Sequence, residues 1–179
     1  MFGMRWFVFS ALIIVGACRA PQEVPEGRID TKVHPEFDKF RPVAIAVTPS
    51  AAPNSALRVH VRREVYERLF DRRYSPFKLS VVDERVSSAG RFEPGNLAWD
   101  ATLETEVSRW KPIRGTRYYA GDGRATLRHK TGEIIWSCAF TNYAFSVREE
   151  AGVKDTDASA EAIADLFIQR LPELPTAQG

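Results

Sequence analysis

The feature that most constrains the fold is a change in the sequence period at residue 100. Across residues 100–146, apolar side chains such as Leu103 and Val107 alternate with charged or hydroxyl side chains. A period of two is typical of β-strands that are buried on one face. A loop at 111–115 and a turn at 130–132 divide the stretch into three strands. This pattern predicts an antiparallel meander.

Upstream of the meander, the sequence predicts a strand, a helix and a second strand. Residues 43–47 form a short apolar run, which fits a buried strand. A helix is predicted from about residue 56 to 73, because apolar residues recur there at every fourth position: Leu57, Val61, Val65 and Leu69. Residues 77–82 predict the second strand. Two strands joined by one helix in this way predict a parallel pair.

The C-terminal part predicts one more helix, whose apolar stripe includes Ile163 and Phe167 and which Pro172 ends. Together these elements predict a single α/β (α+β) domain over residues 42–175. The expected mixed sheet has about five strands, with a β-α-β start, the three-stranded meander and the C-terminal helix packed on it. Residues 84–99 show no clear period and predict no element.

The N-terminal part has the pattern of an export signal that ends at a cysteine. Arg5 precedes an apolar run of about ten residues, within the range of a signal sequence, and Val15-Gly16-Ala17-Cys18 follows. The run is shorter than the roughly 20 residues needed to span a bilayer, which favours a secretion signal over a membrane helix. Small residues before a cysteine resemble the lipobox of bacterial lipoproteins. The alternative is an ordinary signal peptide with a chance cysteine.

These observations predict a lipoprotein signal peptide at 1–17, a lipidated Cys18 that begins a tether at 18–41, and then the domain. Fully extended, such a tether reaches on the order of 70 Å. Two or more acyl chains, such as palmitate, hold a protein stably on a membrane. Arg19 follows the cysteine in place of the Asp that favours inner-membrane retention in enterobacterial lipoproteins. We therefore expect the periplasmic face of the outer membrane.

Composition and cysteine content exclude some classes of protein. Lys and Arg number 25 and Asp and Glu 23, so the bulk charge gives no argument for nucleic-acid binding. Cys138 is the only cysteine besides Cys18, so an exported chain lipidated at Cys18 has no disulfide framework. Cys138 lies in the apolar run 134–140, which predicts a buried, unreactive thiol.

Two short motifs of penicillin-binding enzymes occur, but in the wrong context. Ser75 and Lys78 have the S-x-x-K spacing, and residues 130–132 read K-T-G. Pro76 predicts a strand after Ser75, and positions three apart along a strand lie on opposite faces. The three histidines lack ligand-like spacing, and no glycine-rich phosphate loop follows the first strand. We therefore predict no enzyme activity, no metal, no cofactor and no small-molecule substrate.

Two surfaces are candidate partner-binding sites. The first is an aromatic and basic end of the first hairpin: Trp110, Lys111, Arg114, Arg117, Tyr118 and Tyr119. Such residues carry most of the energy of an interface when they are desolvated. The alternative is that the aromatic rings cap the sheet core while the basic groups face water. The second candidate is a basic helix face that includes Arg58 and Arg62 and fits an anionic surface. Its interleaved acids favour instead a solvated, salt-bridged face.

Four segments in order carry a resemblance to a known family: RPVAIAVTP at 41–49, RYSPFKLSVVDE at 73–84, DATL at 100–103 and TGEIIW at 131–136. The chain resembles small Gram-negative lipoproteins whose soluble part is similar to the N-terminal domain of TolB, and more distantly CsgG and LpoB. The resemblance implies a similar fold and a role in envelope transport or assembly, and it supplies no catalytic residues.

Anchor, composition and resemblance together predict an accessory or scaffold lipoprotein, attached to the membrane through Cys18 and facing the periplasm. It would bind another envelope protein and catalyse no reaction. The alternative is a self-assembling secretion-channel subunit of the CsgG type, whose partners are copies of itself. The charged faces of the predicted strands count against membrane-spanning strands.

Overall fold

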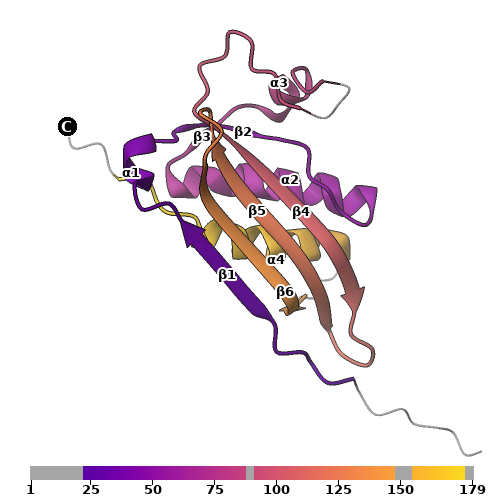
Figure 1. Ribbon diagram of the computed structural model, residues 1–179. Helices are drawn as coiled ribbons and strands as arrows, with labels where there is room; N and C mark the ends of the chain where they lie inside the picture. The colour runs from indigo at the N-terminus through magenta and orange to yellow at the C-terminus, as the bar shows by residue number, and fades with distance from the viewer. Residues whose placement is uncertain (1–21, 88–90, 148–154, 176–179) are drawn as a thin grey trace, which may run out of the picture.

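The computed structural model describes residues 22–87, 91–147 and 155–175. It contains a six-stranded mixed sheet in the order β1-β6-β5-β4-β2-β3. The elements in chain order are β1 (Arg28–Val33), α1 (Phe37–Phe40), β2 (Ala44–Val47), α2 (Ser55–Leu69), the 3-10 turn η1 (Phe70–Arg72), β3 (Ser75–Pro76), α3 (Leu79–Asp83), β4 (Ala101–Pro112), β5 (Tyr118–His129), β6 (Ile134–Ser146) and α4 (Asp155–Arg170). The two long helices, α2 and α4, lie side by side on one face of the sheet (Figure 1).

The predicted fold class is confirmed: one α+β domain with a mixed sheet. The meander is present, because β4, β5 and β6 pair antiparallel in chain order. The β-α-β start is also present, since β2 pairs parallel with β3 and with β4. The register of β5 against β6 shifts between Gly121 and Gly123. Asp122, flanked by these two glycines, therefore marks an irregularity of the kind that glycines in a strand indicate.

The sheet begins earlier than the sequence predicted. Strand β1 pairs antiparallel with β6, from Arg28 opposite Thr141 to Val33 opposite Trp136. Residues that were expected to form a tether therefore form an edge strand. Side chains of β1 are exposed except for the half-buried Ile29, so the strand shows little of the apolar alternation that identifies strands in sequence.

The second predicted strand, at 77–82, is wrong in position and type. Only Ser75–Pro76 pairs with β2, and Leu79–Asp83 forms the short helix α3. Leu79 packs against the core and Val82 is fully buried. These residues are three positions apart and share a face of a helical turn. A segment of only six residues is too short for its apolar pattern to tell a helix from a strand.

The helix predicted from about residue 56 to 73 forms as α2, which ends at Leu69, and the 3-10 turn η1 continues it to Arg72. The side chain of Asn54 accepts a hydrogen bond from the backbone N–H of Leu57 at 2.6 Å, which caps the helix N-terminus. Leu57, Val61, Val65 and Leu69 are at most 1% exposed and face the sheet. The predicted stripe of the last helix is also buried, since Ile163, Phe167 and Leu171 pack into the same core.

The core lies between the sheet and the pair α2 and α4, with Trp136 and Phe140 among its largest side chains. Two large polar side chains of this core have hydrogen-bond partners, as burial requires. The indole N–H of Trp136 donates to the carbonyl of Arg170 at 2.9 Å, and the hydroxyl of Tyr74 donates to the carbonyl of Pro172 at 2.7 Å. Within the described ranges, no helix is both long and apolar enough to cross a membrane.

Candidate functional site

The aromatic residues predicted to bind a partner join the sheet to helix α4. Trp110 of β4 stacks on Tyr119 of β5, with ring centroids 5.7 Å apart, and its centroid lies 5.0 Å from that of Phe145. The indole N–H of Trp110 donates to Ser159 Oγ at 3.2 Å, and the Tyr119 hydroxyl donates to Asp155 Oδ2 at 3.1 Å. Both acceptors belong to α4. These rings therefore hold the first half of α4 against the sheet, as the alternative interpretation of this cluster expected.

The basic residues of the same hairpin point into solvent. Lys111, Arg114 and Arg117 are exposed, and none has an ion-pair partner among the described residues. Tyr118 is half-buried at the start of β5. We refer to Lys111, Arg114 and Arg117 together as the basic hairpin end.

The backbone of this hairpin is held in a defined shape. The Thr116 hydroxyl donates to the carbonyl of Ile113 at 2.8 Å and accepts from the N–H of Tyr118 at 3.1 Å. Ile113 is 4% exposed and packs the loop against the core. Gly115 has a φ of 77°, a left-handed backbone conformation that favours glycine. The basic side chains therefore extend from an ordered loop.

The first described residue lies at the same end of the molecule. The backbone N–H of Gln22 donates to the carbonyl of Arg114 at 3.4 Å. Between Gln22 and β1, the backbone at Gly27 packs so closely on Tyr143 that an added Cβ would lie 2.2 Å from its Cα. The segment before β1 therefore follows the sheet down to the basic hairpin end, as Figure 1 shows.

The two candidate arginines of helix α2 have different surroundings. Arg62 is 11% exposed, donates twice to the carbonyl of Val47, at 2.9 and 3.0 Å, and pairs with Asp83 at 2.5 Å. Its guanidinium joins α2 to the end of β2 and to α3, so it is a structural group. Arg58 is exposed without an ion-pair partner in the described residues. Both line a hollow of about 300 Å³ beside the exposed Val59.

Further along α2, the interleaved arginine and acidic side chains form a partly exposed ion-pair network, in keeping with the salt-bridged face that the alternative interpretation expected. Arg68 pairs with Glu64 on its own helix and with Glu161 and Asp165 on α4. Burial acts to raise the pKa of Glu64, but hydrogen bonds from Arg68 and Arg63 outweigh it and lower that pKa below its ordinary value. These ion pairs connect α2 to α4.

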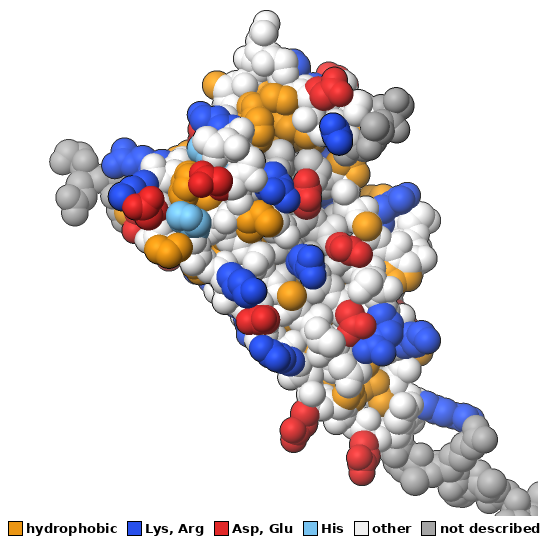
Figure 2. Space-filling view, in the orientation of Figure 1, with side chains coloured by type: hydrophobic (Ala, Val, Ile, Leu, Met, Phe, Trp, Pro, Cys, Tyr) orange, Lys and Arg blue, Asp and Glu red, His pale blue; other side chains and the backbone are white. Residues whose placement is uncertain are grey.

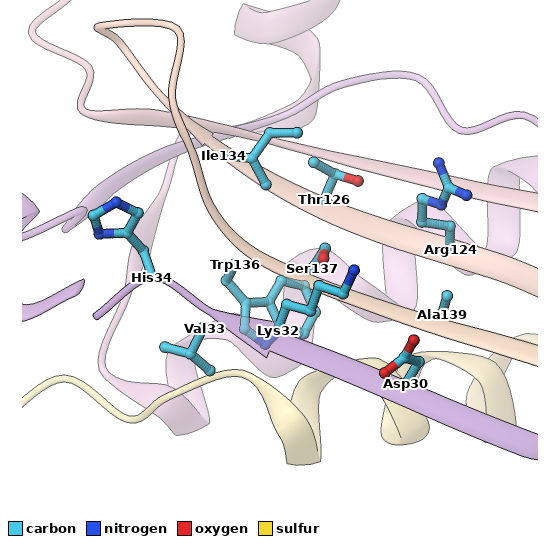
Figure 3. A pocket seen from close by; sticks show the side chains of 10 residues that line it. All are labelled: Asp30, Lys32, Val33, His34, Arg124, Thr126, Ile134, Trp136, Ser137 and Ala139. Carbon is cyan, nitrogen blue, oxygen red and sulfur yellow. The ribbon is translucent and has the colours of Figure 1, made fainter. Parts of the chain in front are cut away.

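The face of the sheet opposite α2 and α4 carries two adjoining hollows among the described residues. The larger, of about 470 Å³, is lined by residues of β1, β5 and β6, with Thr126, Ser137 and Ala139 as its small side chains (Figure 3). Lys32 rises from β1 on one side and Arg124 from β5 on the other. The smaller hollow, of about 200 Å³, shares Arg124 and Ala139. We call this surface the uncovered sheet face.

Charges on the uncovered sheet face have both signs. Figure 2 shows separate basic and acidic side chains across it, with few large apolar groups. Arg124 stands opposite Glu106 in the register of β4 and β5. Neither Arg124 nor Lys32 has an ion-pair partner in the part of the chain that the structure describes. Their charges are therefore directed to solvent at the rim of the larger hollow.

The chemically reactive side chains do not form a site. Cys138 is fully buried, accepts a hydrogen bond from the Thr31 hydroxyl at 3.7 Å between O and S, and has a pKa raised by burial. Ser75 lies exposed in β3 and Lys78 immediately precedes α3. Within the described residues, no group of three or more His, Cys, Asp and Glu side chains is placed to hold a metal ion. Cys18 lies outside the described residues.

The sequence identified the hairpin and helix arginines but missed the uncovered sheet face. Its signal was present as small or hydroxyl side chains at the outward positions of β5 and β6, including Thr126, Ser137 and Ala139. Alternation shows which side chains point outward. It does not show that both long helices pack on the other face.

No protein-family model matches the chain, and no curated protein matches it. Among solved structures, the PelC dodecamer from Paraburkholderia phytofirmans, in two crystal forms, gives TM-scores of 0.51 and 0.50 at 11% and 10% identity. Each alignment covers 84% of this chain and 99% of that chain. The lipoprotein GNA1162 from Neisseria meningitidis gives a TM-score of 0.47 at 19% identity, over 62% of this chain and 87% of that chain. At such identities, the likeness to PelC concerns the fold.

Proposed function

We propose that this protein is a lipid-anchored accessory or scaffold lipoprotein that faces the periplasm and binds another envelope protein without catalysing a reaction. The observation that carries the proposal is the uncovered sheet face, with its two hollows and its unpaired Arg124 and Lys32. The basic hairpin end and Arg58 are also exposed but lie outside the uncovered sheet face. Trp110, Tyr119 and Arg62 serve packing.

The character of the uncovered sheet face favours a protein as the partner. A polyanion such as nucleic acid requires clustered positive charge, whereas here Arg124 stands opposite Glu106. Small side chains leave the hollows open to protruding side chains of a partner, and arginine is enriched in protein interfaces. A stable complex buries about 800 Å² on each partner. The hollows and their charged rim fit the centre of such an interface.

The anchor in this proposal is the lipid on Cys18, and the outer membrane is the proposed location. Support comes from the small residues that precede the cysteine and from Arg19 after it. Metabolic labelling with a palmitate analogue tests the anchor: the wild-type chain takes up label and enters the membrane fraction, and Cys18→Ser does not. Separation of inner and outer membranes then tests the location. Unlabelled wild-type protein would contradict the proposed anchor.

Photo-crosslinking in living cells tests the docking surface. A photoreactive amino acid at Thr126 or Ser137, on the floor of the larger hollow, is expected to capture one discrete envelope protein. The matched control is Glu67, an exposed position on the solvent side of α2. Arg124→Glu should abolish the product while Arg58→Glu, the same charge change on α2, leaves it intact. Equal products from Thr126 and Glu67 would contradict a specific docking face.

A second candidate function is self-assembly into a ring. PelC, which shares the fold, forms a dodecamer. A ring requires two different complementary surfaces on each subunit. In this chain β1 and β3 are the two edge strands of the sheet. Under this alternative, the crosslinks at Thr126 form a ladder of regular mass from this protein alone, and light scattering of the purified full chain gives a multiple of the monomer mass.

A further inference from the structure

The position of Gln22 limits how far the folded domain stands from its proposed lipid anchor. Cys18 precedes Gln22 by four residues. An extended chain spans at most about 3.5 Å per residue, so the lipidated end lies within about 14 Å of Gln22. Since Gln22 is hydrogen-bonded to the carbonyl of Arg114, the same short reach applies to the hairpin. The connection between the lipid and the described domain is therefore a few residues long, in place of the expected tether with a reach on the order of 70 Å.

The charges of the hairpin suit an anionic membrane surface at that distance. Residues 111–118 contain Lys111, Arg114 and Arg117 and no acidic residue. Exposed cations are attracted to anionic headgroups within a Debye length, about 10 Å at 0.1 M salt. Glu23 and Glu26 are exposed on the adjacent segment and partly oppose this attraction. Asp155, exposed at the start of α4 and bonded to Tyr119, is a third acid near this end. The three cations extend together from a loop fixed by its own hydrogen bonds.

We propose that the basic hairpin end is the membrane-facing surface of this protein and binds anionic phospholipid headgroups. The inference rests on the proposed lipidation of Cys18 and adds an orientation to it. The β4–β5 hairpin lies against the membrane, and the β5–β6 turn lies at the far end of the sheet. Strand β5 has 12 residues, so at about 3.4 Å per residue the two ends are roughly 40 Å apart.

Fluorescence quenching in proteoliposomes tests this orientation with the full lipidated chain. A dye is attached to Pro112→Cys at the hairpin end or to Glu133→Cys at the opposite turn; both positions are exposed. Cys138 is buried, so labelling is confined to the introduced thiol. Vesicles contain phosphatidylglycerol in phosphatidylcholine, or phosphatidylcholine alone, with a headgroup-attached nitroxide as quencher. We expect strong quenching at residue 112 and none at residue 133.

Charge variants separate headgroup binding from simple proximity. Neutralising the basic hairpin end with Lys111→Gln, Arg114→Gln and Arg117→Gln should reduce quenching at residue 112 in anionic vesicles. The matched control removes three exposed cations elsewhere: Lys32→Gln, Arg58→Gln and Arg124→Gln. That control should quench like the parent protein. High salt should act like the hairpin variant, because it screens exposed charges.

The outcomes distinguish the two proposals. Intact mass shows first whether Cys18 carries lipid, and an unmodified cysteine overturns the anchor and with it this inference. A lipidated protein with equal quenching at residues 112 and 133 overturns the orientation and leaves the accessory function standing. Quenching at residue 112 that is the same in zwitterionic vesicles and in the hairpin variant overturns headgroup binding.

Discussion

Replacing Trp110 by alanine should destabilise the fold, because the indole connects the end of β4 to helix α4. The change removes the stack on Tyr119, the contact with Phe145 and the hydrogen bond to Ser159. A fully buried tryptophan costs about 3–5 kcal/mol on truncation. Trp110 is half-buried, so we expect the lower end, about 3 kcal/mol. For a domain of this size, that loss lowers Tm by about 6–12 °C.

The hydrogen bond can be measured apart from the packing. Trp110→Phe keeps a ring but leaves the hydroxyl of Ser159, which is fully buried, without its donor. An unsatisfied buried hydroxyl costs about 1–3 kcal/mol. A double-mutant cycle with Ser159→Ala should therefore give a coupling energy of about 1 kcal/mol. Urea unfolding, followed by circular dichroism, supplies the four free energies.

The control for this series is Arg114→Ala on the same hairpin, whose side chain is exposed; its effect should stay within about 0.5 kcal/mol. An unchanged Tm for Trp110→Ala would refute the packing role of the indole. If the same variant also lost its crosslinked partner, the first interpretation of the aromatic cluster as an interface would be restored.

Three further predictions each concern one side chain. Arg62→Met removes two hydrogen bonds to the carbonyl of Val47 and an ion pair with Asp83, and it should lower the unfolding free energy by about 2 kcal/mol. Arg58→Met should have little effect, and urea titration of both variants measures the difference. Burial and the neighbouring Lys130 lower the pKa of His129. The free energy of unfolding should therefore hold above the unfolded pKa of about 6.5 and decrease as the pH falls toward the lower pKa of the folded state. Urea midpoints measured against pH should decrease less in His129→Gln. Cys138 should react with a thiol reagent only after denaturant unfolds the protein, because it is fully buried and its pKa is raised by burial.

Features with a local periodic signature were predictable from the sequence. The meander follows from alternation, and the stripe from Leu57 to Leu69 appears as a buried helix face. Contacts between distant residues had no such signature. Arg62 bonds to a carbonyl 15 positions earlier, and Trp110 bonds to a serine 49 positions later. Their chemical types suggested an interface, but their packing depends on how the helices lie on the sheet.

The missed strand β1 changes the functional argument more than any other difference. An unstructured segment from residue 18 to 41 would leave the domain free to turn and to reach distant partners. Pairing of β1 with β6 fixes that segment to the sheet instead, and the bond from Gln22 to Arg114 brings the start of the described chain to one end of the domain. Under the proposed lipidation of Cys18, the length available for motion above the membrane is therefore a few residues.

The two proposals together place the docking surface at a defined height. Arg124 follows Arg117 by seven residues along the strand direction of β5, which corresponds to about 24 Å. With the basic hairpin end on the headgroups, the hollow beside Arg124 stands about 24 Å above the membrane. A partner that fills this hollow must therefore present its own surface close to the membrane. Crosslinks from Thr126 should accordingly map to the membrane-proximal part of the captured protein, and crosslinks to a region far from its membrane segment would contradict the combined orientation.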